Sequence, residues 1–507
     1  MPDNESKSTS LVGAIAPEYL CGRLDIYTSV EEITEATVVA EVNSAIIYHN
    51  ANLISEDYLY WYRRGLQPIL HRTKDRNTFV LSKCLVNLAE QICTFKGGYF
   101  LQEAAKFVSR RNGAQSKIDK LNEFVFRSGK YDADNKIAEW FHTVGKGVLY
   151  VEETSDDDIP FRSYALDPRS AFVVYSMRPG NRPLYGVNVV TQGTDVFIDV
   201  YTDKKIFRLS GSYAGEKTTG FPNYQKMAIQ LLSVEDNRLG HIPIIEYRYN
   251  SINMGAFESV TYILDCINQV QSGRIDAVEQ FVQSVIVAVN CQFEDNVTAD
   301  QIKKQGMIIL SSIGENKADF KILSEELNQQ QTQTLIDDLK DEAFQICALP
   351  LISQRGRGTY DTTGQAQIFA NGWEQAASAC RNTEDQFRAS NAYYEDIIVD
   401  IVTRRKLIKN LKRTDFALNF VRNETANMQS KAQSFQTLLA AGLHPELAAK
   451  KSGISNDPVA DIKMSEKYMR MIWGDPDAAD KAEESGNGQG EAVIIEEDNA
   501  NGEENLV

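Results

Sequence analysis

The stretch Phe257-Glu-Ser-Val-Thr-Tyr-Ile-Leu-Asp-Cys-Ile-Asn-Gln-Val-Gln-Ser-Gly-Arg-Ile-Asp-Ala-Val-Glu-Gln-Phe-Val-Gln-Ser-Val285 decides the fold of this chain. Its apolar side chains recur every three or four residues, which predicts one amphipathic helix about 40 Å long. A shorter helix is predicted over residues 329–347, with its apolar residues on one face. Because the shorter helix cannot cover the whole apolar stripe, we expect part of the stripe to meet another copy of the chain.

The segments around these helices follow an informative order. A strand, His241-Ile-Pro-Ile-Ile-Glu-Tyr247, precedes the first helix, and two β-prone runs at 307–310 and 319–323 lie between the helices. After the second helix comes a Gly/Arg loop, residues 353–364, and then a helix of about 40 residues. A helical hairpin followed by a loop and a spanning helix suits a wall element of a tube better than an enzyme pocket.

The last long helix, residues 365–405, carries apolar residues seven apart. Such a near-heptad seam can pack against neighbouring elements along its whole length. Two interpretations stay open, a contact with neighbouring copies or an ordinary core helix of a monomer. The subunit-interface candidates from both long helices are Phe281, Val285, Trp373, Phe387 and Tyr394.

The rest of the chain predicts an α-rich region followed by a β-rich region, and hence an α+β fold. Helices are expected at 33–48, 56–65, 78–95, 115–127, 135–144, 432–449 and 462–472. Antiparallel strands joined by short turns are expected at 148–152, 171–177, 184–191, 195–202 and 205–209, with a further strand at 416–421.

Length and composition favour a folded chain of about three domains, with 507 residues of which 43% are hydrophobic and 24% charged. No apolar run reaches the roughly 18 residues of a membrane span. The seven cysteines are scattered without a CxxC pair, which predicts reduced thiols rather than disulfides or a zinc site.

The net charge of −17 is concentrated near the C-terminus. Residues 475–507 hold eleven acids and one lysine, which predicts a disordered acidic tail. The remainder offers no broad basic surface for nucleic acid. Arg355 and Arg357 in the Gly-flanked loop are the local exception: alone they could belong to a flexible surface turn, but repeated around a ring they would form a narrow positive band.

Sequence motifs for enzyme chemistry are absent. The chain has no GxxxxGK[ST], GxGxxG, GxSxG or HExxH, and its five histidines are isolated from one another. The acidic run 156–158 could hold a cation, although a solvated loop is favoured, and the aromatics of 58–64 are better explained by packing than by base stacking. We therefore predict no catalytic residues, no metal and no cofactor.

Several ordered pieces together resemble one protein family. These are Phe95-Lys-Gly-Gly-Tyr-Phe100, Val200-Tyr-Thr-Asp-Lys-Lys-Ile-Phe207, Gly240-His-Ile-Pro-Ile-Ile245, Thr363-Gly-Gln-Ala366 and the helices of 438–466. In this order, over about residues 58–466, the chain resembles the portal (head–tail connector) proteins of tailed bacteriophages, in their siphophage branch. Each piece alone is only weakly specific for this family, whereas the occurrence of all of them in this order is considerably more specific.

The resemblance implies a non-enzymatic virion protein that assembles in the host cytoplasm, without cofactor or membrane. It implies a ring of twelve subunits at one capsid vertex, with a channel through which double-stranded viral DNA enters and leaves. The implied partners are the terminase large subunit, head-completion and tail adaptor proteins, and the major capsid and scaffolding proteins. The alternative is another virion component, an adaptor or minor capsid protein, without a DNA channel.

The implied fold has an α-rich wing, antiparallel β-hairpins, a helical stem hairpin, a small α/β clip, a long wing helix and a helical crown. The expected segments are 1–30 N-terminal arm, 31–240 wing, 241–288 approach to the stem and first stem helix, 289–323 clip, 324–350 return stem helix, 351–364 tunnel loop, 365–422 long wing helix and strand, 423–474 crown, and 475–507 tail.

The resemblance also implies functional positions. The tunnel-loop candidates for DNA contact are Arg355, Arg357 and Thr359, and the channel-lining candidates are Asp276, Glu279, Asp337, Asp338 and Asp341. The family often has a loop of glycine and small residues, so the two arginines are a departure that bears on how the loop meets DNA.

Overall fold

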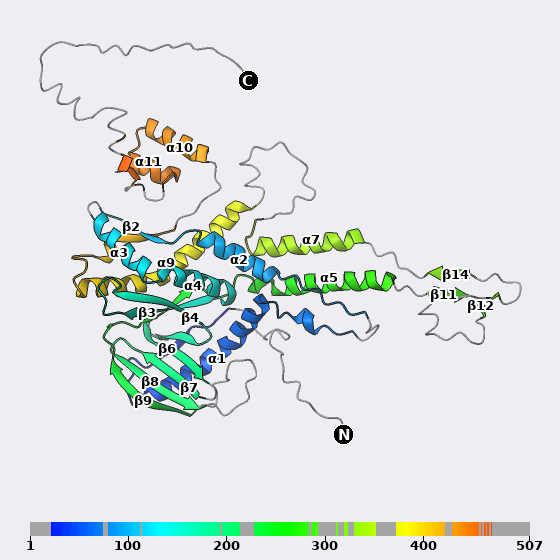
Figure 1. Cartoon of the computed structure of the whole chain (residues 1–507), viewed down its shortest axis with the longest axis horizontal. Coiled ribbons are helices and arrows are strands. Elements are labelled where there is room, and N and C mark those ends of the chain that lie inside the picture. Colours follow the sequence, from blue (N-terminus) through cyan, green and yellow to red (C-terminus); the bar gives the residue numbers. More distant parts are fainter. Residues whose placement is uncertain are drawn as a thin grey trace, which may run out of the picture. The chain divides into compact units, whose positions relative to one another are not determined.

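The computed structural model gives a mixed α+β fold, as predicted (Figure 1). It describes residues 22–74, 80–111, 114–192, 195–212, 228–282, 286–289, 291–292, 311–312, 319–322, 329–350, 372–420, 428–455, 458, 461–462, 464–465 and 468. The chain divides into two compact units, Met1–Asn423 and Glu424–Val507.

A six-stranded sheet forms one part of the first unit. Its strand order is β1-β5-β6-β7-β8-β9, with β1 parallel to β5 and every other neighbouring pair antiparallel. The antiparallel strands predicted between 171 and 209 are confirmed, whereas β1 and β9 were not predicted. The strands are β1 (Ile26–Thr28), β5 (Ala171–Ser176), β6 (Pro183–Gln192), β7 (Asp195–Tyr201), β8 (Lys205–Ser212) and β9 (Ala228–Asp236).

Helix α1 (Val38–Arg63) packs on one face of this sheet. The alternation of strand β7 buries Val196, Ile198 and Val200 on the same side, because successive strand residues point to opposite faces. They join Val42 of α1 and its apolar neighbours in one core cluster. The structure gives a single 26-residue helix where the sequence predicted two shorter ones.

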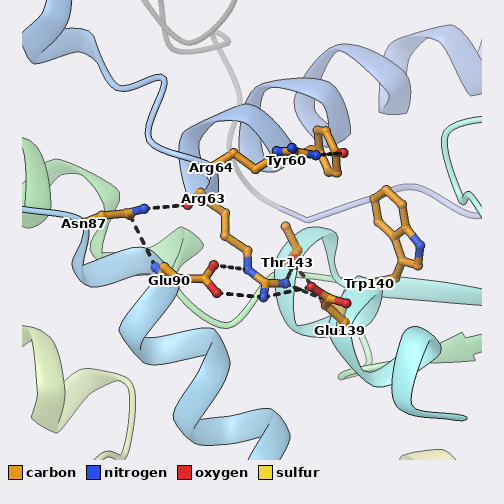
Figure 2. A pocket seen from close by; sticks show the side chains of 8 residues that line it. All are labelled: Tyr60, Arg63, Arg64, Asn87, Glu90, Glu139, Trp140 and Thr143. Carbon is orange, nitrogen blue, oxygen red and sulfur yellow. Dashed lines mark hydrogen bonds and ion pairs between the residues drawn. The ribbon is translucent and has the colours of Figure 1, made fainter. Parts of the chain in front are cut away.

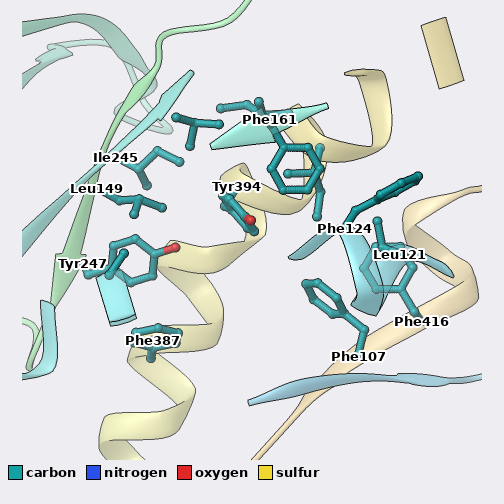
Figure 3. Packing of buried hydrophobic residues seen from close by; sticks show 14 of the residues in the cluster. Phe107, Leu121, Phe124, Leu149, Phe161, Ile245, Tyr247, Phe387, Tyr394 and Phe416 are labelled. Carbon is teal, nitrogen blue, oxygen red and sulfur yellow. The ribbon is translucent and has the colours of Figure 1, made fainter. Parts of the chain in front are cut away.

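A three-stranded antiparallel sheet, β10-β3-β4, supports the second core (Figure 3). Helix α9 lays Phe387 and Tyr394 against Tyr247 of β10 and Phe161 of β4. The elements that surround this core are β10 (Ile244–Arg248), β3 (Lys146–Glu153), β4 (Phe161–Leu166), β2 (Lys106–Ser109), β15 (Phe416–Asn419), α3 (Gln115–Arg127), α4 (Lys130–Val144) and α9 (Trp373–Arg404).

The interface assignment of Phe387 and Tyr394 is wrong. Both side chains are fully buried within one chain, 1% and 0% exposed, so neither can meet a neighbouring copy. Trp373 is half-buried, with its ring near those of Phe95 and Tyr99. The heptad spacing predicted an apolar face correctly, but spacing does not specify whether that face meets a strand of its own chain or a helix of another.

The helix predicted over 78–95 begins later than expected. Helix α2 spans Leu88–Phe100, and Asn87 caps it by accepting a hydrogen bond from the backbone N–H of Glu90 at 3.4 Å. Residues 80–87 form neither helix nor sheet. Their apolar spacing resembles that of a helix, but their backbone hydrogen bonds go to side chains far away in the sequence.

The second unit contains the short helices α10 (Met428–Ala440) and α11 (Pro445–Ser452). The sequence predicted helix over 432–449 with Gly442 and Pro445 as turn-forming residues, and Gly442, with φ +83°, lies between the two helices. A left-handed residue ends a helix readily when it is glycine, and proline suits the first position of the next helix. Of the helix expected at 462–472, the structure describes only four positions, and the acidic tail lies outside the described residues.

Candidate functional site: the α5–α7 hairpin

The predicted helical hairpin is confirmed. Helix α5 (Thr261–Val282) follows the short 3-10 helix η3 (Glu258–Val260) and lies beside α7 (Gln329–Ile346) (Figure 1). The two helices pack through Leu264, Ile267, Ile336 and Ala343. In the sequence between them lie two antiparallel strand pairs, β11 (Ile286–Val289) with β14 (Asp319–Ile322) and β12 (Cys291–Gln292) with β13 (Ser311–Ser312).

Buried charges hold the base of α5 in place. Arg23 and Glu258 form an ion pair in which both side chains are fully buried. The Glu258 carboxylate also accepts the backbone N–H groups of Gly22 at 3.0 Å and Gly255 at 2.8 Å. Three donor contacts on one buried carboxylate compensate for its desolvation. The N-terminal segment is thereby tied to the start of α5.

A second buried pair lies close to the first. Lys146 at the start of β3 approaches Glu56 of α1 at 3.1 Å, and both side chains are almost completely buried. Burial raises the pKa of Glu56, and the charges of Lys146 and Arg23 oppose that rise. The base of the hairpin, α1 and β3 therefore meet at two buried ion pairs.

Gly145 lets the loop before α5 approach this cluster. Its φ is +91°, and a Cβ there would lie 1.9 Å from the carbonyl oxygen of Asn253. No side chain fits that space, so only glycine permits the contact. The Asn253 amide then donates to the carbonyl of Arg23 at 3.2 Å, which binds the loop to the N-terminal segment.

Helix α7 leaves part of the apolar stripe of α5 uncovered, as the helix lengths predicted. Ile275 and Val278 of α5 are 43% and 48% exposed within one chain, and Leu335 of α7 is 48% exposed. Isolated exposed apolar residues are ordinary, but here they continue a buried stripe on paired helices. Two interface candidates, the side chain of Phe281 and the whole of Val285, lie outside the described residues.

Asp276 does not line an open surface, contrary to the prediction. Its side chain is 3% exposed and forms ion pairs with Arg72 at 2.8 Å and with Lys74. Burial would raise the pKa of Asp276, but the hydrogen bonds from Lys74 and the Ser82 backbone prevail and lower it to about 2. The sequence could not reveal this because the two cations come from a segment about 200 positions earlier.

The other acidic candidates differ from Asp276 in their exposure. On α7, Asp338 is exposed, while Asp337 and Asp341 are half-buried. Burial and the nearby charges of Asp337 and Asp338 raise the pKa of Asp341, so this face of α7 is an acidic cluster. On α5, Glu279 is half-buried. Arg355, Arg357 and Thr359 lie outside the described residues.

A cavity of about 530 Å³ opens between α1, α2 and α4 (Figure 2). At its centre, Arg63 binds Glu90 through Nε at 2.6 Å and Glu139 through Nη2 at 3.1 Å. Its Nη1 donates to Thr143 Oγ1 at 2.7 Å, so every guanidinium nitrogen has a partner. Partial burial would raise the pKa of Glu90, but the Arg63 hydrogen bonds lower it. This saturated ion-pair cluster binds three helices together and presents no free acid or base.

Other features associated with catalysis or membranes do not occur in the described part of the chain. His49 and His142 are buried, and burial lowers the pKa of each to about 3, so both are neutral core residues. Among the described residues no group of His, Cys, Asp and Glu is arranged to hold a metal ion. None of the described helices is long and apolar enough to cross a membrane.

A helical hairpin that leaves an apolar stripe uncovered within one chain is typical of a structural assembly protein. The family profile for "Phage portal protein, SPP1 Gp6-like" matches residues 44–470, most of the chain. The chain belongs to this family and is a phage portal protein, a component of the virion. The predicted family relationship is therefore confirmed.

Comparison with solved structures finds gene transfer agent particles. The neck of the empty particle, computed with C6 symmetry, is 10% identical with a TM-score of 0.41, covering 72% of this chain and 90% of that one. The native neck, computed with C12 symmetry, is 10% identical with a TM-score of 0.41 and coverages of 72% and 89%. The virion of the native particle is 9% identical with a TM-score of 0.39, covering 72% of this chain and 89% of that one. No curated protein sequence matches the chain.

Proposed function

We propose that this portal protein forms a ring of twelve subunits at one capsid vertex, and that double-stranded DNA is packaged and ejected through the channel of that ring. Within the chain, the α5–α7 hairpin supports this proposal most directly, because its apolar stripe stays exposed at Ile275 and Val278. In a closed ring, sister hairpins would cover these residues, and rotational closure would prevent open filaments.

The segments assigned by resemblance fit this proposal. Helices α5 and α7 are the stem, and the strand pairs β11–β14 and β12–β13 belong to the clip, where the terminase large subunit and later the adaptor proteins dock. The sheets, α1 to α4 and α9 form the wing. Helices α10 and α11 belong to the crown, and residues 351–364 are the tunnel loop.

The acidic face of α7 suits a channel in which DNA must slide. A protein that neutralises six to ten phosphates binds DNA tightly, because each contact releases counterions. The carboxylates of Asp337, Asp338 and Asp341 neutralise no phosphate and release no counterions. A channel wall that carries them therefore does not bind DNA tightly. Screening over about 8 Å at physiological salt keeps their repulsion of the duplex weak.

The ring can be tested by sedimentation of the purified chain. We expect one species with the mass of about twelve copies of the 56.9 kDa chain, because the uncovered stem stripe drives association. A monomer over the accessible range of concentration and salt would contradict the proposal. If electron microscopy showed rings in which no helical hairpin surrounds the axis, the alternative would be favoured, an adaptor or minor capsid protein.

We also propose that Arg355 and Arg357, with Thr359, form a narrow cationic band at the tunnel loop that centres or slows the duplex. The double variant Arg355→Gln/Arg357→Gln should assemble rings but change packaging rate or genome retention, because two positive charges per subunit are lost. The matched control Arg110→Gln/Arg162→Gln removes the same charge from exposed wing positions and should behave as wild type. Unchanged packaging, retention and ejection in the tunnel-loop variant would refute this role.

A further inference from the structure

One face of α5 carries a row of polar residues that its apolar stripe does not explain. Asn268, Ser272 and Asp276 lie four residues apart, so they share one face of the helix, and all three are buried. The extended segment Val80–Val86 lies against this row, and its alternate backbone N–H groups donate to the three side chains. The bonds are Val86 N to Asn268 Oδ1 at 2.8 Å, Cys84 N to Ser272 Oγ at 2.9 Å and Ser82 N to Asp276 Oδ1 at 2.6 Å.

The spacing of the two elements makes this ladder possible. Four residues of an α-helix advance about 6.0 Å, and two residues of an extended chain advance about 6.6 to 6.8 Å. The difference accumulates to only about 1.5 Å over two intervals, which side-chain adjustment can absorb. Asn268, Ser272 and Asp276 therefore serve the backbone of 82–86 as the edge of a β-strand would.

The three hydrogen bonds between 82–86 and α5 form a ladder, and its Asn268 end is connected to α1 and α2. The Asn268 amide donates to Gln67 Oε1 at 2.6 Å, and the Gln67 amide donates to Asn87 Oδ1 at 3.0 Å. Asn87 caps α2 and donates to the carbonyl of Arg63, in the last turn of α1, at 2.7 Å. A chain of amide hydrogen bonds thus runs from α5 to the ends of both helices.

The Asp276 end of the ladder is held by ion pairs. Besides Ser82 N, Asp276 binds Arg72 and Lys74, which precede the extended segment. Arg72 also donates to the carbonyl of Ser82 at 3.0 Å, and Lys74 to that of Val80 at 3.1 Å. A single carboxylate on α5 therefore holds two chain segments, 72–74 and 80–82, that meet at this point.

We propose that Val80–Val86 is a strap that fixes the position of α5 along its axis and makes α5 move with α1 and α2. The strap can shift only in steps, because a slip of one residue turns the N–H groups of 82, 84 and 86 away from the three side chains, and the next matching position is two strap residues, or about one helical turn, away. The α5 face that carries the ladder is covered within one chain and is therefore unavailable to a channel or a neighbouring subunit. The proposal does not depend on the ring.

Hydrogen exchange of the intact chain tests the ladder. Ser272→Ala should speed exchange of the Cys84 amide about tenfold, because that amide loses its buried acceptor. The faster exchange should spread to the ends of α1 and α2 and leave α7 unchanged. Gln269→Ala, at an exposed position of the same helix, is the matched control and should change neither. Unchanged exchange at Cys84, or loosening of α7 instead of α1 and α2, would overturn the proposal.

Two replacements of Asp276 separate hydrogen bonding from charge. Asp276→Asn keeps an acceptor for Ser82 N but removes the charge that holds Lys74, so the Ser82 amide should stay protected while Lys74 is acylated several-fold faster. Asp276→Leu should lose Ser82 protection as well. Equal loss of Ser82 protection in both variants, or unchanged acylation of Lys74 in both, would show that the carboxylate does not hold the two segments as proposed.

Discussion

Glu258→Gln is expected to lower the free energy of unfolding by about 3 to 5 kcal/mol, because it leaves Arg23 charged in a fully buried site. The amide can still accept one backbone N–H, but it no longer neutralises the guanidinium. Denaturant unfolding at equilibrium measures the change. An effect of this size would identify the base of α5 as a point where the N-terminal segment stabilises the hairpin.

Two controls define this result. Glu123→Gln removes one partner of the exposed Arg127–Glu123 pair and should cost at most about 1 kcal/mol. The double variant Arg23→Met/Glu258→Gln removes both buried charges, keeps an amide oxygen as an acceptor for a backbone N–H, and should regain part of the lost stability. If Glu258→Gln were as mild as Glu123→Gln, the buried pair would not have the assigned role.

Ile275→Asp/Val278→Asp is expected to abolish ring assembly while the monomer stays folded. Both side chains are about half exposed in one chain, so a carboxylate is tolerated there. In the ring the same positions would be covered, and burying two unpaired charges per subunit would cost more than the contact contributes. Sedimentation would report the oligomeric state, and circular dichroism would report folding.

The matched variant Ile275→Leu/Val278→Ile keeps both positions apolar and should assemble normally. Phe387→Asp should instead unfold the chain, because Phe387 lies in the core between α9 and β10. Intact rings from Ile275→Asp/Val278→Asp would remove these residues from the interface. A folded monomer from Phe387→Asp would contradict the core assignment.

Elements with a strong local pattern could be predicted from the sequence. The paired helices α5 and α7, helix α3 and strands β5 to β8 were found because their periodicity is sustained over many residues. Strands β1 and β2 were missed because three or four residues carry too little alternation. The helix expected over 78–95 failed at its start because the backbone of 82–86 bonds to Asn268, Ser272 and Asp276, which local spacing cannot reveal.

The functional candidates show the same limit. Helix lengths predicted that α7 could not cover α5, and Ile275 and Val278 are exposed accordingly. The heptad seam of α9 identified Phe387 and Tyr394 as one face but could not tell that strands of the same chain cover it. The charge of Asp276 suggested solvent, whereas its partners Arg72 and Lys74 bury it. Periodicity indicates that a helix face is covered, but only the three-dimensional structure shows which residues cover it.

Electron cryomicroscopy of the purified 507-residue chain tests the central claim most directly. The account predicts closed rings around an axial hole, with α5–α7 hairpins surrounding the hole, the acidic face of α7 toward it, and Ile275 and Val278 covered by the neighbouring copy. Compact single particles, or rings that carry the hairpin on their outer rim, would contradict it.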